Sequence, residues 1–159
     1  MRIILIAGSV LIIIGVALMT WMLATADERN VIKVSLDDGE TKPIKFEALS
    51  LVPGSECEYV VKLKKGGGAD EYDLKFDFVE TGDGKLKDFA RVKIITNGNV
   101  VHDELLSTAL DNEHIISSVN FDEDRNTEFR IVYYLPLDVG NEAKNAEALF
   151  GLMLTASNE

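Results

Sequence analysis

The sequence contains little of the chemistry on which small exported domains and hydrolytic enzymes usually depend. It has a single cysteine, Cys57, which excludes an intrachain disulfide, so the stability of the domain has to come from a hydrophobic core. Cys57 alternates in phase with Tyr59, Val61 and Leu63. This spacing predicts a small buried residue on the inner face of a strand rather than a reactive thiol.

The chain is also poor in histidine, since His102 and His114 are the only two and lie twelve residues apart. They do not form the H-E-x-x-H helix of zinc proteases, and the sequence has neither a G-x-S-x-G motif nor a Cys–His signature. We therefore interpret both histidines as surface or edge residues and predict no catalytic residue, no cofactor and no metal site. A fold that brought two ligating histidines together would favour an enzyme instead.

Positive charge is scarce, with 16 lysines and arginines against 27 aspartates and glutamates, which gives a formal net charge of -11. Because so acidic a chain repels phosphate backbones, nucleic acid is excluded as a partner. The acidity indicates a solvated surface that keeps the domain soluble.

The sequence does contain one long uncharged stretch, residues 3–26, near its start. A run of about 20 apolar residues is long enough to cross a bilayer. Arg2 precedes the run, while Asp27 and Glu28 follow it. Since positively charged residues tend to stay on the cytoplasmic side, residues 27–159 are expected on the outside.

A small-residue motif ends the hydrophobic run. Ala24 and Ala26 form an A-x-A pattern directly before Asp27, which predicts cleavage by a signal peptidase after Ala26. We expect contact with a membrane through residues 3–26 before cleavage, and a secreted or cell-surface protein afterwards. The alternative is a retained membrane anchor with the domain outside. In both cases residues 27–159 are expected to form one extracellular domain.

Short segments in which apolar and polar residues alternate fill residues 27–159, a pattern typical of half-buried strands. The expected strands are residues 31–36, 44–49, 57–64, 72–78, 89–96, 99–102, 115–121, 127–135 and 147–156. Asn97-Gly98 predicts a two-residue hairpin turn between two of them. One segment, residues 103–110, is expected to be helical, with Asp103 as its cap.

About eight or nine short strands separated by turns predict an all-β fold. The two long connections, residues 103–114 and 136–146, suit Greek-key crossings between two sheets. We therefore predict a jelly-roll or Greek-key β-sandwich.

Several stretches, taken in order, resemble the TasA/camelysin family of exported proteins. Residues 129–148 read FRIVYYLPLDVGNEAKNAEA, with a strand that ends in Leu-Pro and a Gly-Asn-Glu-Ala crossover. Residues 51–55, LVPGS, match a leucine–x–Pro-Gly turn before a strand, and residues 86–89, LKDF, precede the central strand. Residues 154–158, LTASN, are similar to the end of the family's last strand.

The resemblance implies an extracellular jelly-roll that is exported with a SipW-type signal peptide and polymerises into biofilm-matrix fibres. It also implies that the mature N-terminal segment is donated as a strand to the next subunit, which is a second copy or a related matrix protein. The residues support this prediction independently, because Ile32, Val34 and Leu36 give residues 27–36 an apolar face at the predicted new terminus. A head-to-tail contact that does not close produces a filament. The alternative is that this strand pairs within its own sheet.

Two other functions are compatible with an exported sandwich. One is a binding module for carbohydrate or a partner protein, although the aromatic residues mostly fall at core positions, which weakens an interpretation as a sugar site. The other is a camelysin-like metalloprotease, for which the sequence offers no ligand pattern. The leading prediction is a structural subunit that is not an enzyme.

Overall fold

The computed structural model describes residues 30–46, 49–67, 71–80, 84–140, 143, 147–148 and 150–157. The predicted cleavage site at Ala24, Ala26 and Asp27 lies outside these residues, as does the hydrophobic run. Within the described ranges, no helix has the length and apolarity that a membrane span requires. The chain divides into two compact units, Met1–Val31 and Ile32–Glu159, and the β-domain corresponds to the second.

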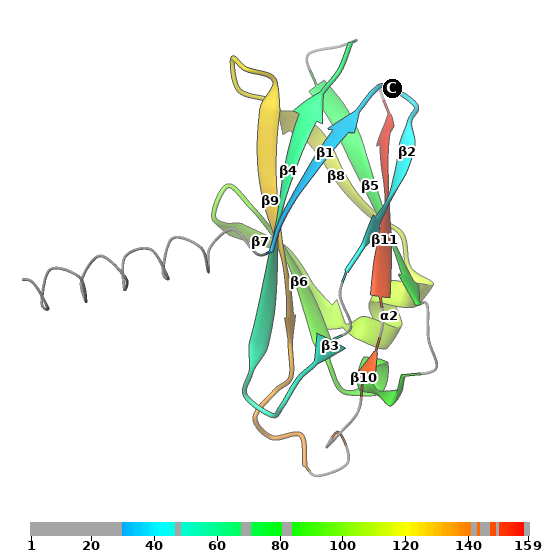
Figure 1. Ribbon diagram of the computed structural model, residues 1–159, viewed down its shortest axis with the longest axis vertical. Coiled ribbons are helices and arrows are strands. Elements are labelled where there is room, and N and C mark those ends of the chain that lie inside the picture. The colour runs from blue at the N-terminus through cyan, green and yellow to red at the C-terminus, as the bar shows by residue number, and fades with distance from the viewer. Residues whose placement is uncertain are drawn as a thin grey trace, which may run out of the picture. The chain divides into compact units, whose positions relative to one another are not determined.

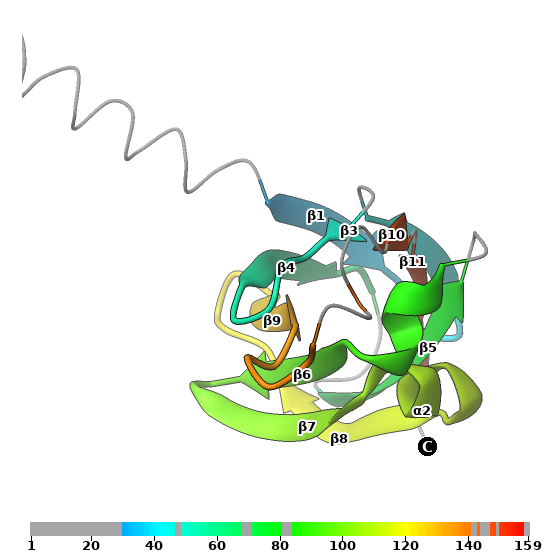
Figure 2. The same cartoon turned by 90° about the horizontal axis from the view of Figure 1, so that it is seen from below.

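Nine strands of the described chain form two sheets that lie face to face (Figures 1 and 2). The first sheet has the order β1 (Val31–Leu36), β4 (Glu56–Lys65), β9 (Asn126–Tyr134), β6 (Arg91–Thr96) and β7 (Asn99–Leu105). The second has the order β2 (Thr41–Lys45), β11 (Phe150–Ser157), β5 (Glu71–Glu80) and β8 (His114–Asn120). The smaller elements are the paired strands β3 (Leu49–Ser50) and β10 (Glu147–Ala148), the 3-10 helix η1 (Lys85–Asp88) and the helix α2 (Leu106–Asp111).

The predicted β-sandwich of eight or nine strands is therefore confirmed, and so is the hairpin at Asn97-Gly98. Thr96 pairs with Asn99, which leaves two residues in the turn between β6 and β7. Both turn residues have positive φ, 50° at Asn97 and 76° at Gly98, as a two-residue turn of this hand requires.

The helix prediction for residues 103–110 was wrong at its start. Asp103 pairs with Lys93 inside β7, and the helix begins only at Leu106. The carboxylate of Asp103 does not cap the helix. It accepts hydrogen bonds from Arg91 Nε at 3.1 Å and from the hydroxyl of Tyr134 at 2.8 Å, and these bonds hold it in the sheet.

The core lies between the two sheets and is built from the alternate residues that the sequence pattern picked out. Phe76 and Tyr133 are fully buried, and the ring of Tyr133 stacks on that of Phe150 across the sandwich, with centroids 6.0 Å apart. Cys57 is a free thiol that packs against this core, in agreement with the predicted inner face, but it is half-buried rather than buried.

One strand pair differs from the rest. The other neighbours in the two main sheets pair antiparallel. Gly66, directly after β4, donates its N–H to the carbonyl of Leu36 at 3.0 Å, so the C-terminal ends of β1 and β4 meet and the two strands run in the same direction (Figure 1). Strand β1 therefore occupies a sheet edge through parallel pairing alone.

Two connections join an edge strand of one sheet to an edge strand of the other. The turn after β1 leads into β2, and helix α2 leads from β7 into β8. Figure 2 shows β7 and β8 running side by side along one margin of the sandwich. The candidate functional sites described below lie at this margin and at the β1 edge of the sandwich.

Candidate functional site

The predicted donor segment is the edge strand β1 of the five-stranded sheet. Leu36 is fully buried at its C-terminal end, and Ile32 and Val34 are half-buried and pack against the core. Lys33 and Ser35, which alternate with them, are exposed. The three predicted residues therefore share the inner face of one strand, and in this single chain the strand pairs within its own sheet.

The turn that follows β1 is held independently of the strand. Glu40 donates its N–H to the carbonyl of Asp37, and the Glu40 carboxylate accepts the N–H of Asp37 at 2.9 Å. Gly39, with φ of +73°, donates to the carbonyl of Ala156 at the end of β11. These bonds anchor the turn to the second sheet, and Lys42 of β2 also donates a hydrogen bond to the carbonyl of Ser35 in β1.

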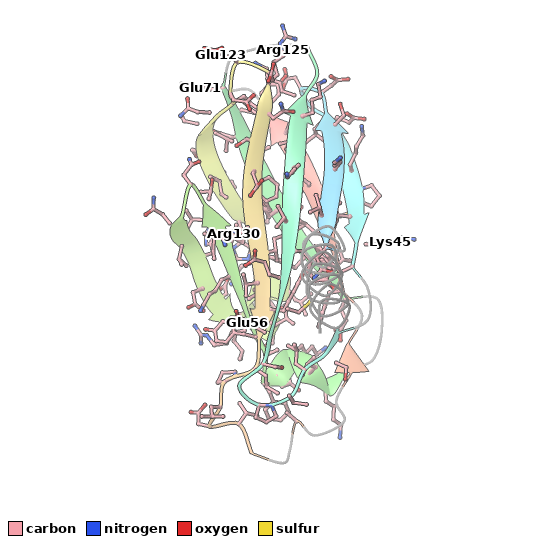
Figure 3. All side chains as sticks on the ribbon, turned by 60° about the vertical axis from the view of Figure 1, so that its left-hand side comes forward. Lys45, Glu56, Glu71, Glu123, Arg125 and Arg130 are labelled. Carbon is pink, nitrogen blue, oxygen red and sulfur yellow. The ribbon has the colours of Figure 1, made fainter. Side chains whose placement is uncertain are left out.

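A polar groove of about 840 Å³ lies beside β1, on the outer face of β1, β4 and β9 and the adjoining turns. Its charged lining consists of three lysines and two carboxylates, Lys33, Lys62, Lys64, Asp122 and Glu128. Lysine is in excess here, in contrast to the net charge of -11 for the chain. Figure 3 shows charged side chains on the strands of this sheet, Arg130 of β9 among them, and Arg130 lies 3.5 Å from Glu58.

The two histidines, whose spacing of twelve residues does not predict a contact, lie together at the margin formed by β7 and β8. His102 is on β7 and His114 on β8, and their ring centroids are 4.8 Å apart. The expectation of edge strands is correct, because β7 and β8 are the last strands of their sheets. The expectation of a surface position is wrong for His114, which is 4% exposed because it lies opposite the buried Phe76 on the inner face.

A β-bulge orients the β7 side of this cluster. Ile95 pairs with Val100 and Ile94 pairs with His102, which leaves Val101 unpaired. Because directly opposed residues point to the same face, His102 points inward with the buried Ile94. Without the extra residue, His102 would point outward. Two positions later, Glu104 lies opposite the buried Val92 and also points inward.

The three side chains form a cluster of two imidazoles and one carboxylate. The ligand atoms of His102, Glu104 and His114 all lie within 4.8 Å of one another. The Nε2 atom of His114 is 3.1 Å from the Glu104 carboxylate and 3.4 Å from the carbonyl oxygen of Ala109. His114 is buried, while His102 and Glu104 are half-exposed, so the cluster opens to solvent on its β7 side.

Burial also perturbs the imidazole of His102. Desolvation lowers its pKa below the usual 6.5, and the adjacent His114 ring acts in the same direction. The Glu104 carboxylate and a hydrogen bond to the backbone of Ile115 oppose the shift without cancelling it. The lowered pKa favours the neutral form of the His102 imidazole.

Sequence reasoning missed this cluster because it judged the histidines by their spacing alone. The available signal was the spacing of His102 and Glu104, which would share one face of a strand, but the strand was expected to end at residue 102 and Glu104 fell in the helix expected over residues 103–110. The bulge at Val101 and the pairing of β7 with the margin of the other sheet carry no signal in the local sequence. The residues of the predicted cleavage site cannot be related to either site, because they lie outside the described residues.

The sequence matches no family model and no curated protein. Among solved structures, the fold is similar to that of a periplasmic lysozyme inhibitor of g-type lysozyme, PliG, from Aeromonas hydrophila. The two share 6% sequence identity over 80% of this chain and 99% of the inhibitor, with a TM-score of 0.40.

Proposed function

We propose that this chain is an exported structural subunit of extracellular matrix fibres, which assembles head-to-tail when each copy donates its β1 segment to the next. The observation that carries the proposal is the position of β1, an edge strand held by parallel pairing in an otherwise antiparallel sandwich. The resemblance to the TasA/camelysin family in the sequence points to the same assembly.

The energetics of the edge favour exchange. Parallel pairing is slightly less stable per residue than antiparallel pairing, and an edge strand has hydrogen-bond partners on one side only. If β1 leaves, it uncovers the N–H and C=O groups of β4 and the apolar surface that Ile32, Val34 and Leu36 cover. The β1 segment of a second copy can cover both the β4 backbone groups and this apolar surface. The incoming strand is not joined to the acceptor's β2, so it is free to pair with β4 in either direction.

The groove beside β1 supports a contact between copies as well. Lys33, on the outer face of β1, forms part of its wall, so a donated strand would bring its own lysine to the acceptor. With three lysines and two carboxylates in the lining, a carboxylate of a second copy is a favourable local partner for the groove.

Export is the second part of the proposal. The uncharged residues 3–26, with Arg2 before them and Asp27 after them, support passage of residues 27–159 across the membrane. The protein is then secreted or lies at the cell surface, after cleavage by a signal peptidase or with residues 3–26 retained as an anchor. The net charge of -11 supports a polypeptide surface, and not nucleic acid, as the partner.

A binding module is the second candidate, and the lysine-lined groove is the observation that favours it. Its described lining contains Lys33, Lys62 and Lys64 but no aromatic ring, which favours an acidic protein or polymer over a stacked sugar. An enzymatic function has less support than these two. The contact between His102 and His114 is the observation in its favour, because two imidazoles in contact can hold a metal ion.

Electron microscopy of the secreted material tests the fibre proposal. The chain with its own residues 1–26 is expressed in a secreting host, beside a variant that lacks residues 27–36. We expect fibres from the first and folded, non-elongating subunits from the second, as judged by circular dichroism and light scattering. Fibres from the truncated variant, or a truncated chain that does not fold, would show that β1 belongs to its own domain.

A further inference from the structure

We infer that His102, Glu104 and His114 form a binding site for a divalent transition metal ion of the zinc class, at the margin where β7 and β8 meet. The inference goes beyond the proposed fibre function and does not depend on it. It stands on the geometry of the three side chains and on their position in different sheets.

The ligand set is the first argument. Two imidazoles and one carboxylate are the ligands of many zinc sites with three protein ligands, and imidazole selects against calcium and magnesium. Ligands at ~2.1 Å from a tetrahedral zinc lie roughly 3.4 Å apart. The Nε2 of His114 and the Glu104 carboxylate are already 3.1 Å apart, and all three ligand atoms are within 4.8 Å of one another. A small rotation of the half-exposed His102 closes the remaining distance.

The surroundings of the cluster are the second argument. The ring of Phe78 packs edge-on against His114 at 5.6 Å and holds it from the core side. The bulge at Val101 directs His102 into the cluster, and bulges are common where a strand has to present one side chain.

The position of the cluster indicates what the ion would do. His102 and Glu104 belong to the last strand of one sheet and His114 to the last strand of the other. The chain has one cysteine and so no disulfide to tie the sheets together. A metal held by all three residues links the two sheets across this margin, and its fourth position faces solvent on the side of the half-exposed ligands.

Zinc titration of the full chain in mild detergent, stripped of metal with a chelator, tests the inference. We expect one zinc ion per chain by calorimetry, and visible ligand-field absorption when cobalt replaces zinc. At zinc 100-fold above its Kd, the melting temperature should rise on the order of 10 °C. Glu104→Gln keeps the shape of the side chain but removes the anionic ligand, so it should weaken binding about 100-fold and reduce the melting shift in proportion.

The matched control is Glu113→Gln. Glu113 is an exposed acid directly before His114 that pairs with Lys75 at 2.6 Å, outside the cluster. This variant should bind zinc like the unchanged chain. His102→Gln is a second variant that removes one ligand. It is chosen instead of a His114 variant, because His102 is half-exposed and its replacement is less disruptive to folding than that of the buried His114. Equal zinc affinity in Glu104→Gln, His102→Gln and Glu113→Gln would overturn the inference, as would the absence of stoichiometric binding in the unchanged chain.

Discussion

Phe76 of β5 and Phe129 of β9 meet edge to face between the two sheets, with ring centroids 5.0 Å apart and an interplanar angle of 82°. Both rings are buried, and each belongs to a central strand of its sheet. This aromatic contact helps to pack the two sheets against each other.

Phe76→Ala should therefore lower the free energy of unfolding by about 3–5 kcal/mol, because it leaves a cavity between the sheets. Urea unfolding followed by fluorescence or circular dichroism measures this loss. Val79→Ala is the matched control, since Val79 lies on the same strand but is 39% exposed, and it should cost less than about 1 kcal/mol. Similar losses for the two variants would contradict the proposed packing.

Tyr133 carries a hydroxyl for which the described residues provide no hydrogen-bond partner, although the side chain is fully buried. Burial raises the pKa of this phenol well above 10, so the hydroxyl remains neutral. Tyr133→Phe removes an unsatisfied polar group and keeps the stacked ring. We expect the variant to be unchanged or up to about 1 kcal/mol more stable in urea unfolding, where loss of a bonded hydroxyl would cost about 1 kcal/mol.

His102 should titrate below its usual pKa of 6.5 in the metal-free protein, because burial and the neighbouring His114 ring disfavour its charged form. The unfolded chain then binds a proton at a higher pH than the folded chain does. The contribution of His102 to stability is present above pH 6.5 and is lost as the pH falls through the folded pKa.

Proton NMR of the imidazole resonances in the metal-free chain measures this pKa directly. His102→Gln removes the group, so the fall in stability between pH 7 and pH 5 should be smaller in the variant than in the unchanged chain. A folded-state pKa above 6.5 for His102 would mean that the Glu104 carboxylate dominates the site.

Val34→Asp and Ser35→Asp are a matched pair for the proposed strand donation. The residues are adjacent in β1 and each change adds one negative charge, but Val34 packs against the core, whereas Ser35 is exposed in the lysine-lined groove, where a carboxylate is tolerated. Val34→Asp should abolish elongation, because a donated strand would carry a charge into an apolar groove. Ser35→Asp should leave fibre formation within a few-fold of the unchanged chain.

Light scattering and electron microscopy of the secreted variants read out this comparison. Circular dichroism and thermal melting show whether Val34→Asp still folds, and a melting temperature near that of the unchanged chain separates an assembly defect from a folding defect. Elongation by Val34→Asp at the normal rate would refute a donated β1.

Most strands were predictable because each is a local alternation of apolar and polar residues that is kept in the fold. The strand expected at residues 44–49 was wrong, because β2 spans Thr41–Lys45 and shares only Ile44 and Lys45 with it. The buried Phe129, Ile131 and Tyr133 of β9 were all recognisable from period-two spacing. The Asn97-Gly98 turn was equally readable, because few other residues tolerate its positive φ values. Sheet order was not predictable in this way, since the pairing of β1 with β4 joins residues that local patterns do not connect.

The candidate metal cluster lay beyond sequence reasoning for a related reason. A single extra residue at Val101 reverses the facing of His102, and a strand pattern does not reveal where such a residue is inserted. The wrong prediction for Asp103 has a similar cause. Its position suggested a helix cap, but its carboxylate accepts hydrogen bonds from Arg91 and Tyr134, which belong to other strands of the sheet.

The shared direction of β1 and β4 also has a mechanical consequence. The turn after Leu36 is bonded to Ala156 near the end of β11, so the last described residues lie at the C-terminal end of β1, opposite Val31. Tension between Val31 and Ser157 therefore acts along the length of β1, and its hydrogen bonds to β4 bear the load together in shear rather than opening one after another. A strand at an edge that is thermodynamically easy to exchange at rest is, in this geometry, hard to extract under tension.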